Sequence, residues 1–126
     1  MVADCTARCN GGEGFVAFSG STVRHCTATS NTLDGCRVST NVTVTDCTAQ
    51  GQGTATGIHT TGADNRIDSN QVLDNASGIL ADTTGSLFIR NSASGNTTAY
   101  AIPAGNDVGP IGSAATATSR WASIAF

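Results

Sequence analysis

Three stretches of the chain repeat nearly the same seven residues: DCTARCN (4–10), HCTATSN (25–31) and DCTAQGQ (46–52). Their cysteines, Cys5, Cys26 and Cys47, are each 21 residues apart. Asn70 and Asn91 continue the series, so the repeat runs through most of the chain. A fixed period of this length indicates that Cys-Thr-Ala marks a position in a repetitive architecture.

Four other positions of the repeat stay small or apolar in almost every unit. These columns are Val2, Val23, Val44, Ile67 and Phe88; Ala7, Ala28, Ala49, Val72 and Ala93; Phe15, Cys36, Ile58, Ile79 and Tyr100; and Ala17, Val38, Thr60, Ala81 and Ile102. Inward positions two residues apart are typical of short β-strands, and Gly and Asn between them favour corners. The sequence therefore predicts a β-solenoid with one repeat per coil, stacked at about 4.8 Å.

A fifth column is polar, and consists of Asn10, Asn31, Gln52, Asn75 and Asn96. Stacked amide side chains can each hydrogen-bond to the neighbours above and below. The column therefore predicts an amide, or asparagine, ladder along one corner of the solenoid.

The stretch NRIDSNQVLDNASGILADTTGSLFIRNSASGNTTAYAIPAGNDVGPI (65–111) resembles the right-handed parallel β-helix repeat proteins of the pectate-lyase-like and NosD-like group. Its pattern I-x-x-N-x-V-x-x-N-x-x-G-I-x-A is similar to one coil of that fold, and the resemblance covers about residues 2–111. It implies an all-β, right-handed parallel β-helix of about five coils over residues 1–111. The fold hosts many activities and many pure scaffolds, so the resemblance implies no particular chemistry.

The ending GNDVGPIGSAATATSRWASIAF (105–126) resembles the C-terminal cap of large bacterial β-helix proteins of unassigned activity. It implies a capping tail at 112–126, in which Trp121, Ile124 and Phe126 cover the open end of the core. At the other end, Val2 and Cys5 already belong to the first coil. An uncapped coil exposes unpaired strand edges, so we expect a homo-oligomer formed through the N-terminal coil.

The composition argues against two classes of partner. Charged residues make up 12% of the chain, Lys is absent and the net charge is -3, which disfavours binding to nucleic acid. No apolar run approaches the roughly 20 residues that cross a bilayer, so no membrane contact is expected. No signal peptide is visible and the localisation is left open, although the resembling proteins are usually secreted or at the cell surface.

The five cysteines are predicted to be mainly structural. Cys5, Cys26 and Cys47 are expected to point inward as small buried residues in place of Asn, and Cys36 lies in an apolar column. Their spacing is not that of a zinc site and no His converges on them, so no metal and no cofactor are expected. Cys9, near a corner, is the candidate for a reactive or intermolecular thiol.

The candidate binding site is a surface site around the loop GQGTATG (51–57), which carries the two additional residues of the third coil. Insertions at solenoid corners often carry function. Arg37 and His59 share an outward column beside this loop, and we predict a site formed by them with Thr54 and Thr56.

A second candidate pair is His25 and Asp46, in an outward column with Asp4, Ser69 and Arg90. A His beside a carboxylate on the next coil can act as an acid–base pair, and the alternative is a weak surface ion pair.

Enzymatic activity is the less favoured hypothesis. Polysaccharide lyases need a calcium site with a basic residue and glycoside hydrolases need paired carboxylates, whereas no two acids are expected to stack in the aligned columns. The leading hypothesis is a non-catalytic β-helix module with a structural, assembly or glycan-contacting role. The alternatives are a carbohydrate-active enzyme or its fragment, and an ice- or surface-binding protein that uses the column Thr6, Thr27, Thr48, Gln71 and Ser92.

Overall fold

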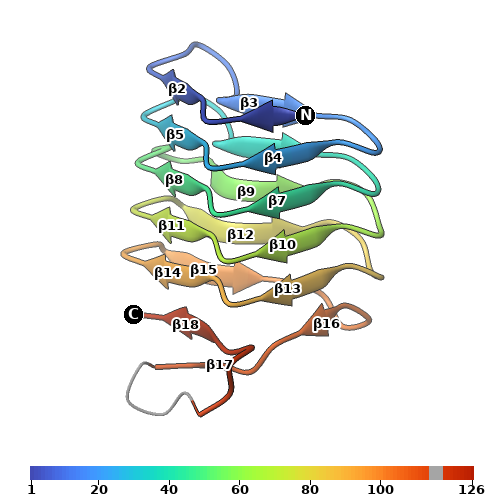
Figure 1. Cartoon of the computed structure of the whole chain (residues 1–126). Helices are drawn as coiled ribbons and strands as arrows, with labels where there is room; N and C mark the ends of the chain where they lie inside the picture. Colours follow the sequence, from blue (N-terminus) through green and yellow to red (C-terminus); the bar gives the residue numbers. More distant parts are fainter. Residues whose placement is uncertain (114–117) are drawn as a thin grey trace.

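Each repeat folds into three short strands that stack on the equivalent strands of the next repeat (Figure 1). The computed structural model describes residues 1–113 and 118–126, and every strand pairing among them is parallel. The result is a parallel β-helix of about five turns, which confirms the predicted fold class. Within the described ranges, no helix is long and apolar enough to cross a membrane.

Three sheets form the walls of the β-helix. The first contains β1 (Val2–Ala3), β4 (Thr22–Arg24), β7 (Thr43–Thr45), β10 (Arg66–Asp68), β13 (Leu87–Ile89) and β16 (Asp107–Val108). The second contains β2 (Thr6–Arg8), β5 (Thr27–Thr29), β8 (Thr48–Gln50), β11 (Gln71–Leu73), β14 (Ser92–Ser94), β18 (Ser123–Ala125) and β17 (Ile111–Gly112). The third contains β3 (Phe15–Ala17), β6 (Cys36–Val38), β9 (Thr56–Thr60), β12 (Ser77–Ala81) and β15 (Thr98–Ala101).

The register of these sheets confirms the apolar columns. Val23 pairs with Val44, Ala28 with Ala49, and Ile58 with Ile79, so like residues lie on like residues. Phe88 is the largest fully buried side chain, and the inner faces of all three sheets form one continuous core. Side chains alternate between the two faces of a strand, so the residues between these columns face outward.

Polar side chains at the corners satisfy backbone N–H groups of the preceding coil. The N–H of Cys47 donates to the Asn70 side-chain oxygen at 3.0 Å, and the N–H of Asn70 donates to that of Asn91 at 3.0 Å. The equivalent N–H of Cys26 points at the Cys47 sulfur, 3.4 Å away. The other two corners repeat the pattern, with the pairs Asn10–Asn31, Asn31–Gln52, Gln52–Asn75, Asn75–Asn96, Val42–Asn65, Asn65–Ser86 and Ser86–Asn106. Buried backbone groups need such partners, which explains why polar residues recur in the core.

Residues in the left-handed backbone region recur at the bends of each coil, and two sets of them flank the second sheet. One set of bends is Asp4, His25, Asp46, Ser69 and Arg90, with φ between 51° and 59°. The other set is Cys9, Ser30, Gly51, Asp74 and Gly95, with φ between 54° and 66°. These bends turn the chain sharply between the sheets and direct the side chains of the first set away from the core.

The third sheet begins at a column of close backbone approach. This column is Gly14, Gly35, Gly57 and Gly78, and a Cβ atom at any of them would lie 2.4–2.7 Å from a carbonyl oxygen of the next coil. Ala99 holds the same position in the last coil, where the third sheet ends at β15. Gly therefore occupies this position only in coils whose third-sheet strand pairs with a further strand on the C-terminal side.

Cys5 does not share the environment of its repeat partners. Cys26, Cys36 and Cys47 are buried, as predicted, whereas Cys5 is exposed, so its predicted inward burial is wrong. Cys26 and Cys47 are packed between coils on both sides, while the strand beside Cys5 is the first of its sheet.

The tail extends the second sheet by two strands. β18 pairs with β14 so that Ile124 lies opposite Ser92 and Ala125 opposite Ala93. This register directs Ile124 and Phe126 outward, and Phe126 is 74% exposed. Trp121 is 45% exposed, so the expected cover of the core by Trp121 and Phe126 does not form. Part of the predicted cap, residues 114–117, lies outside the described residues.

Candidate functional site

The outer face of the third sheet brings two predicted site residues side by side. Arg37 of β6 and His59 of β9 are register partners on adjacent coils, and both lie at outward positions between buried neighbours. The Arg37 side chain is 49% exposed, whereas that of His59 is only 15% exposed. The His59 ring is therefore enclosed by neighbours although it points away from the core.

Two carboxylates hold the His59 ring from opposite sides. Its Nδ1 lies 2.7 Å from Asp34 Oδ2, and its Nε2 lies 3.1 Å from Asp82 Oδ2. Asp34 comes from the turn before β6, and Asp82 directly follows β12, so the contacts join three consecutive coils. Asp34 is itself fixed, because its Oδ1 accepts the backbone N–H of Thr56 at 3.0 Å.

Both groups are stabilised in their charged forms. The hydrogen bond between His59 and the Asp34 carboxylate raises the pKa of His59 more than burial lowers it, and the contact with Asp82 raises this pKa further. Burial acts to raise the pKa of Asp34, but its bonds with His59 and Thr56, with the charges of His59 and Arg37, lower it overall. Both ring nitrogens of an imidazolium are donors, so neither nitrogen of His59 is left to accept a proton.

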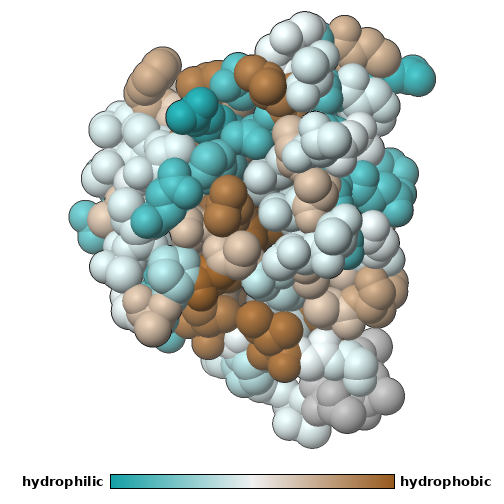
Figure 2. Space-filling model, turned by 180° about the vertical axis from the view of Figure 1, so that it is seen from behind, coloured by the Kyte–Doolittle hydropathy of each residue, from teal (hydrophilic) through white to brown (hydrophobic). Residues whose placement is uncertain are grey.

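A shallow groove lies next to this cluster. Its volume is about 320 Å³, and its lining includes Glu13, Arg37, Val16 and Phe18. The Arg37 Nη1 is 3.5 Å from Glu13 Oε1, and the Phe18 side chain is 73% exposed. Figure 2 shows this face, with hydrophilic side chains gathered toward the N-terminal end and hydrophobic surface continuing below them. The groove combines an aromatic surface with fixed polar groups.

Two acids outside the columns aligned in the sequence do stack. Phe15 pairs with Cys36, so Glu13 and Asp34, two residues earlier in each coil, occupy equivalent positions on adjacent coils. The cations of Arg37 and His59 lie beside them and offset their repulsion. The columns compared in the sequence began at the strands, and these two residues lie in the turns before them.

The other predicted residues fall elsewhere. Thr56 has a buried side chain and contributes only its backbone N–H, and Thr54 is exposed in the loop before β9. His25 and Asp46 lie on a different corner, where the His25 ring is 3.5 Å from Asp4 and 3.9 Å from Asp46. All three side chains are about half exposed or more, which describes a weak surface ion pair.

Asp34, Asp82, Glu13 and Phe18 are the site residues that sequence reasoning missed. Asp82 is opposite Thr61, two residues beyond the His59 position, so it reaches the ring diagonally. A search for His and acids two positions apart on adjacent coils would have found it. Glu13 and Asp34 were detectable from the equal spacing to Phe15 and Cys36.

The threonine column of the second sheet is in register but short. Thr6, Thr27 and Thr48 pair in sequence, and Gln71 and Ser92 follow. The next outward column is mixed, with Arg8, Thr29, Gln50, Leu73 and Ser94. Regular hydroxyl spacing is thus limited to three coils of one column.

The cysteine thiols do not form a cluster with other ligands. All five are free, and in the described part of the chain no group of three or more His, Cys, Asp or Glu side chains could hold a metal ion. Burial raises the pKa of the Cys47 thiol to about 11 and that of Cys36 further still. Cys9 is exposed, and its role as a reactive thiol stays a prediction.

Comparison with known proteins identifies the family. The family model described as periplasmic copper-binding protein (NosD) matches residues 2–108, which is most of the chain. Comparisons with curated proteins and with solved structures gave no match. The matched range coincides with the stacked coils from β1 to β16, and the chain therefore belongs to the NosD family of parallel β-helix proteins.

Proposed function

We propose that this chain is a non-catalytic binding module that contacts a glycan through the outer face of its third sheet. Ligand sites commonly pair apolar and aromatic surface with a few fixed polar groups. The groove lined by Phe18 and Arg37 has this composition, and it lies beside the His59 cluster, because Arg37 is the register partner of His59. The description of the family as a binding protein is consistent with this proposal.

The observation that carries the proposal is the enclosure of His59 between Asp34 and Asp82. A general base needs a free nitrogen within reach of the substrate. Here both ring nitrogens are engaged, and Asp34 is further held by the Thr56 amide. The cluster thus supplies carboxylate acceptors in fixed positions, with the Arg37 guanidinium beside them as a donor, which suits recognition better than proton transfer.

The charge of the face indicates the class of glycan. Three carboxylates, those of Glu13, Asp34 and Asp82, surround the two cations Arg37 and His59. The excess is negative, and the whole chain carries a net charge of -3. A polyanionic polysaccharide would be repelled, so the proposed ligand is a neutral or amino-sugar glycan.

The family description names copper, whereas in residues 1–113 and 118–126 no three His, Cys, Asp or Glu side chains come together in a group that could hold a metal ion. Copper sites use thiolate, thioether or imidazole ligands. The buried thiol of Cys47 has a raised pKa, the imidazole of His59 is held by two carboxylates, and Met1 is the only methionine. No step of the proposed function therefore involves copper.

Binding to a panel of neutral and amino-sugar oligosaccharides, measured by calorimetry, tests the proposal. Phe18→Ala and Arg37→Ala should each weaken binding about tenfold, because one removes the stacking surface and the other a fixed donor. Arg8→Ala is the matched control, since Arg8 is an exposed arginine on the second sheet. It should leave the affinity unchanged.

Two outcomes would count against this function. Equal weakening by Arg8→Ala, or the absence of binding to any oligosaccharide, contradicts a site on the third sheet. Release of new reducing ends from a polysaccharide, lost on Asp34→Asn, would instead favour a carbohydrate-active enzyme.

We also propose that the chain forms a homo-oligomer through its first coil. β1, β2 and β3 are the terminal strands of their three sheets, and such edges are templates for pairing with another chain. A second copy offers the same edges, so two coils can meet face to face about a two-fold axis. Sedimentation over a wide concentration range should show a mass that rises above the monomer. A monomeric mass at every concentration would contradict the proposal.

A further inference from the structure

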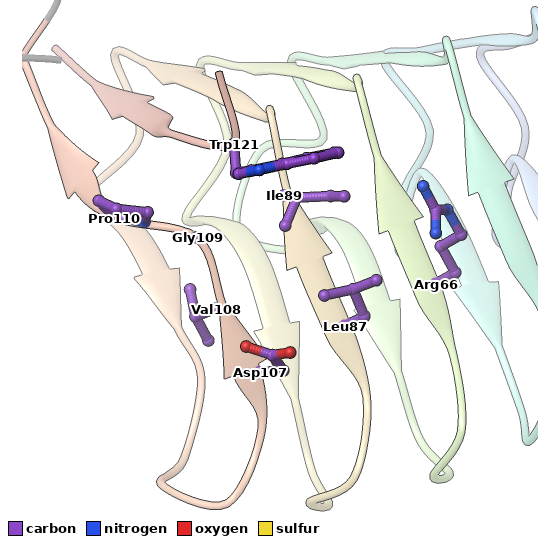
Figure 3. Close-up of a pocket in the computed structure, with 8 residues that line it drawn as sticks. All are labelled: Arg66, Leu87, Ile89, Asp107, Val108, Gly109, Pro110 and Trp121. Carbon is purple, nitrogen blue, oxygen red and sulfur yellow. The ribbon is translucent and has the colours of Figure 1, made fainter. Parts of the chain in front are cut away.

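A pocket lies on the outer face of the first sheet, at its C-terminal end (Figure 3). Its volume is about 440 Å³, within the range of small-molecule sites. Its apolar lining consists of Leu87 and Ile89 of β13, Val108 of β16, Pro110 and Trp121. Two charged residues also line it, the cation Arg66 and the anion Asp107. It is separate from the groove on the third sheet.

The two charged residues are placed on opposite sides of the apolar floor. Arg66 pairs with Leu87, and Leu87 pairs with Asp107, so the cation and the anion are two strands apart with Leu87 between them. Figure 3 shows Arg66 and Asp107 on either side of Leu87, with Trp121 and Ile89 along one edge. Two strand spacings correspond to about 9.6 Å. The pocket therefore has a positive end, an apolar middle and a negative end.

Neighbouring residues hold the positive end in place. The Arg66 Nη2 donates to Asp68 Oδ2 at 2.7 Å, and Arg90 donates to both oxygens of the same carboxylate. Asp68 is 4% exposed, and although burial raises its pKa, the bonds from Arg90, Arg66 and Ser69 lower it to about 2. Arginine has five N–H donors, so Arg66 keeps donors for a ligand after binding Asp68.

The same network positions the aromatic wall. The Arg90 guanidinium lies over the Trp121 ring at 5.1 Å, and the Arg90 backbone N–H donates to the Trp121 carbonyl at 3.3 Å. Asp68 thus links the cation at one end of the pocket to the tryptophan at its edge. A ring held in this way presents a preformed apolar surface, which reduces the entropy lost when a ligand binds.

We propose that this pocket binds a short apolar peptide with free termini, its carboxylate at Arg66 and its ammonium at Asp107. Opposite charges separated by an apolar floor match a zwitterion with apolar side chains, because each terminus meets a group of opposite charge. A di- or tripeptide spans roughly 7–10 Å, which matches the separation of the two strands. A neutral sugar would bring no charged group to either Arg66 or Asp107.

Titration with trileucine, followed by tryptophan fluorescence, tests the proposal. Trp121 is the only tryptophan of the chain, so a signal reports this pocket directly. Trileucine should give a saturable change, and both N-acetylation and C-terminal amidation of the peptide should weaken binding about tenfold, since each removes one ion pair. These comparisons use the unaltered chain and do not depend on the folding of any variant.

Substitutions of Arg66 and Asp107 test which terminus of the peptide each residue binds. Arg66→Gln should weaken binding of trileucine about tenfold but leave the affinity for the C-terminal amide unchanged. Asp107→Asn should also weaken binding of trileucine about tenfold but leave the affinity for the N-acetylated peptide unchanged. Arg24→Gln, on the same sheet at β4, and Phe18→Ala, in the groove of the third sheet, should have no effect. The proposal is overturned if trileucine gives no saturable signal, if a neutral disaccharide binds equally well, or if blocking the termini changes nothing.

Discussion

Asn70→Leu is expected to lower the free energy of unfolding by about 3–5 kcal/mol, because buried partners lose their hydrogen bonds. The Asn70 side-chain oxygen accepts the Cys47 N–H at 3.0 Å, and its amide donates to the Val44 carbonyl at 3.0 Å and to Asn91 at 3.1 Å. Asn70 is 2% exposed, so water cannot replace these partners. Urea denaturation followed by circular dichroism measures the loss.

Two variants serve as controls for Asn70. Asn70→Cys should be milder than Asn70→Leu, because Cys47 holds the same position one coil earlier and its sulfur lies 3.4 Å from the Cys26 N–H. Gln71→Leu changes an exposed neighbour and should alter stability by less than about 0.5 kcal/mol. Equal losses for Asn70→Leu and Gln71→Leu would show that the buried amide contributes nothing specific.

Gly78→Ala is expected to destabilise the fold by about 2–3 kcal/mol through steric overlap. A Cβ at this position would lie 2.4 Å from the Ala99 carbonyl oxygen and 2.9 Å from a methyl group of Val72. The first of these atoms belongs to the backbone of the next coil, so the clash is relieved only if the coils move apart. A lower midpoint of urea denaturation, with an unchanged slope, would report this loss.

Gly12→Ala is the matched control for Gly78→Ala. A Cβ at Gly12 would meet no atom within 4 Å. Ala99 provides a second comparison, because it occupies the Gly78 position in the last coil and should tolerate Gly at a cost below about 1 kcal/mol. If Gly78→Ala were as stable as Gly12→Ala, close approach of the coils would not explain the glycine column.

Most of the fold could be predicted from the sequence because a solenoid repeats one local rule. Each apolar column needs only a constant spacing, and the columns through Val44, Ile58 and Ala49 pair as the spacing indicates. The ends depart from the rule, since a terminal coil has a neighbour on one side only. That difference exposes Cys5, and the register of β18 with β14 turns Phe126 outward.

The candidate site was predictable in part, for the same reason. Arg37 and His59 are neighbours because they share a column, which the spacing gives directly. The partners of His59 come from outside that column, as Asp34 lies in a turn and Asp82 reaches it diagonally. Such contacts depend on side-chain length and rotamer, which a column of equivalent positions does not describe.

The corner hydrogen bonds give the β-helix a direction. In each corner pair given above, a side chain of the later coil accepts a backbone N–H of the coil before it. The series at one corner ends where the Asn91 N–H donates to the Ser123 hydroxyl. During synthesis, the corner backbone N–H groups of one coil therefore gain their acceptors only when the next coil has folded onto it. Loss of a coil from the N-terminal end leaves every remaining backbone N–H of these corners with its acceptor, whereas loss of β18 removes the acceptor of Asn91. The side-chain amides point the other way, because Asn70 donates to the Val44 carbonyl of the coil before it and Asn91 donates to that of Ile67. Each boundary between two coils is thus joined by hydrogen bonds that both coils donate.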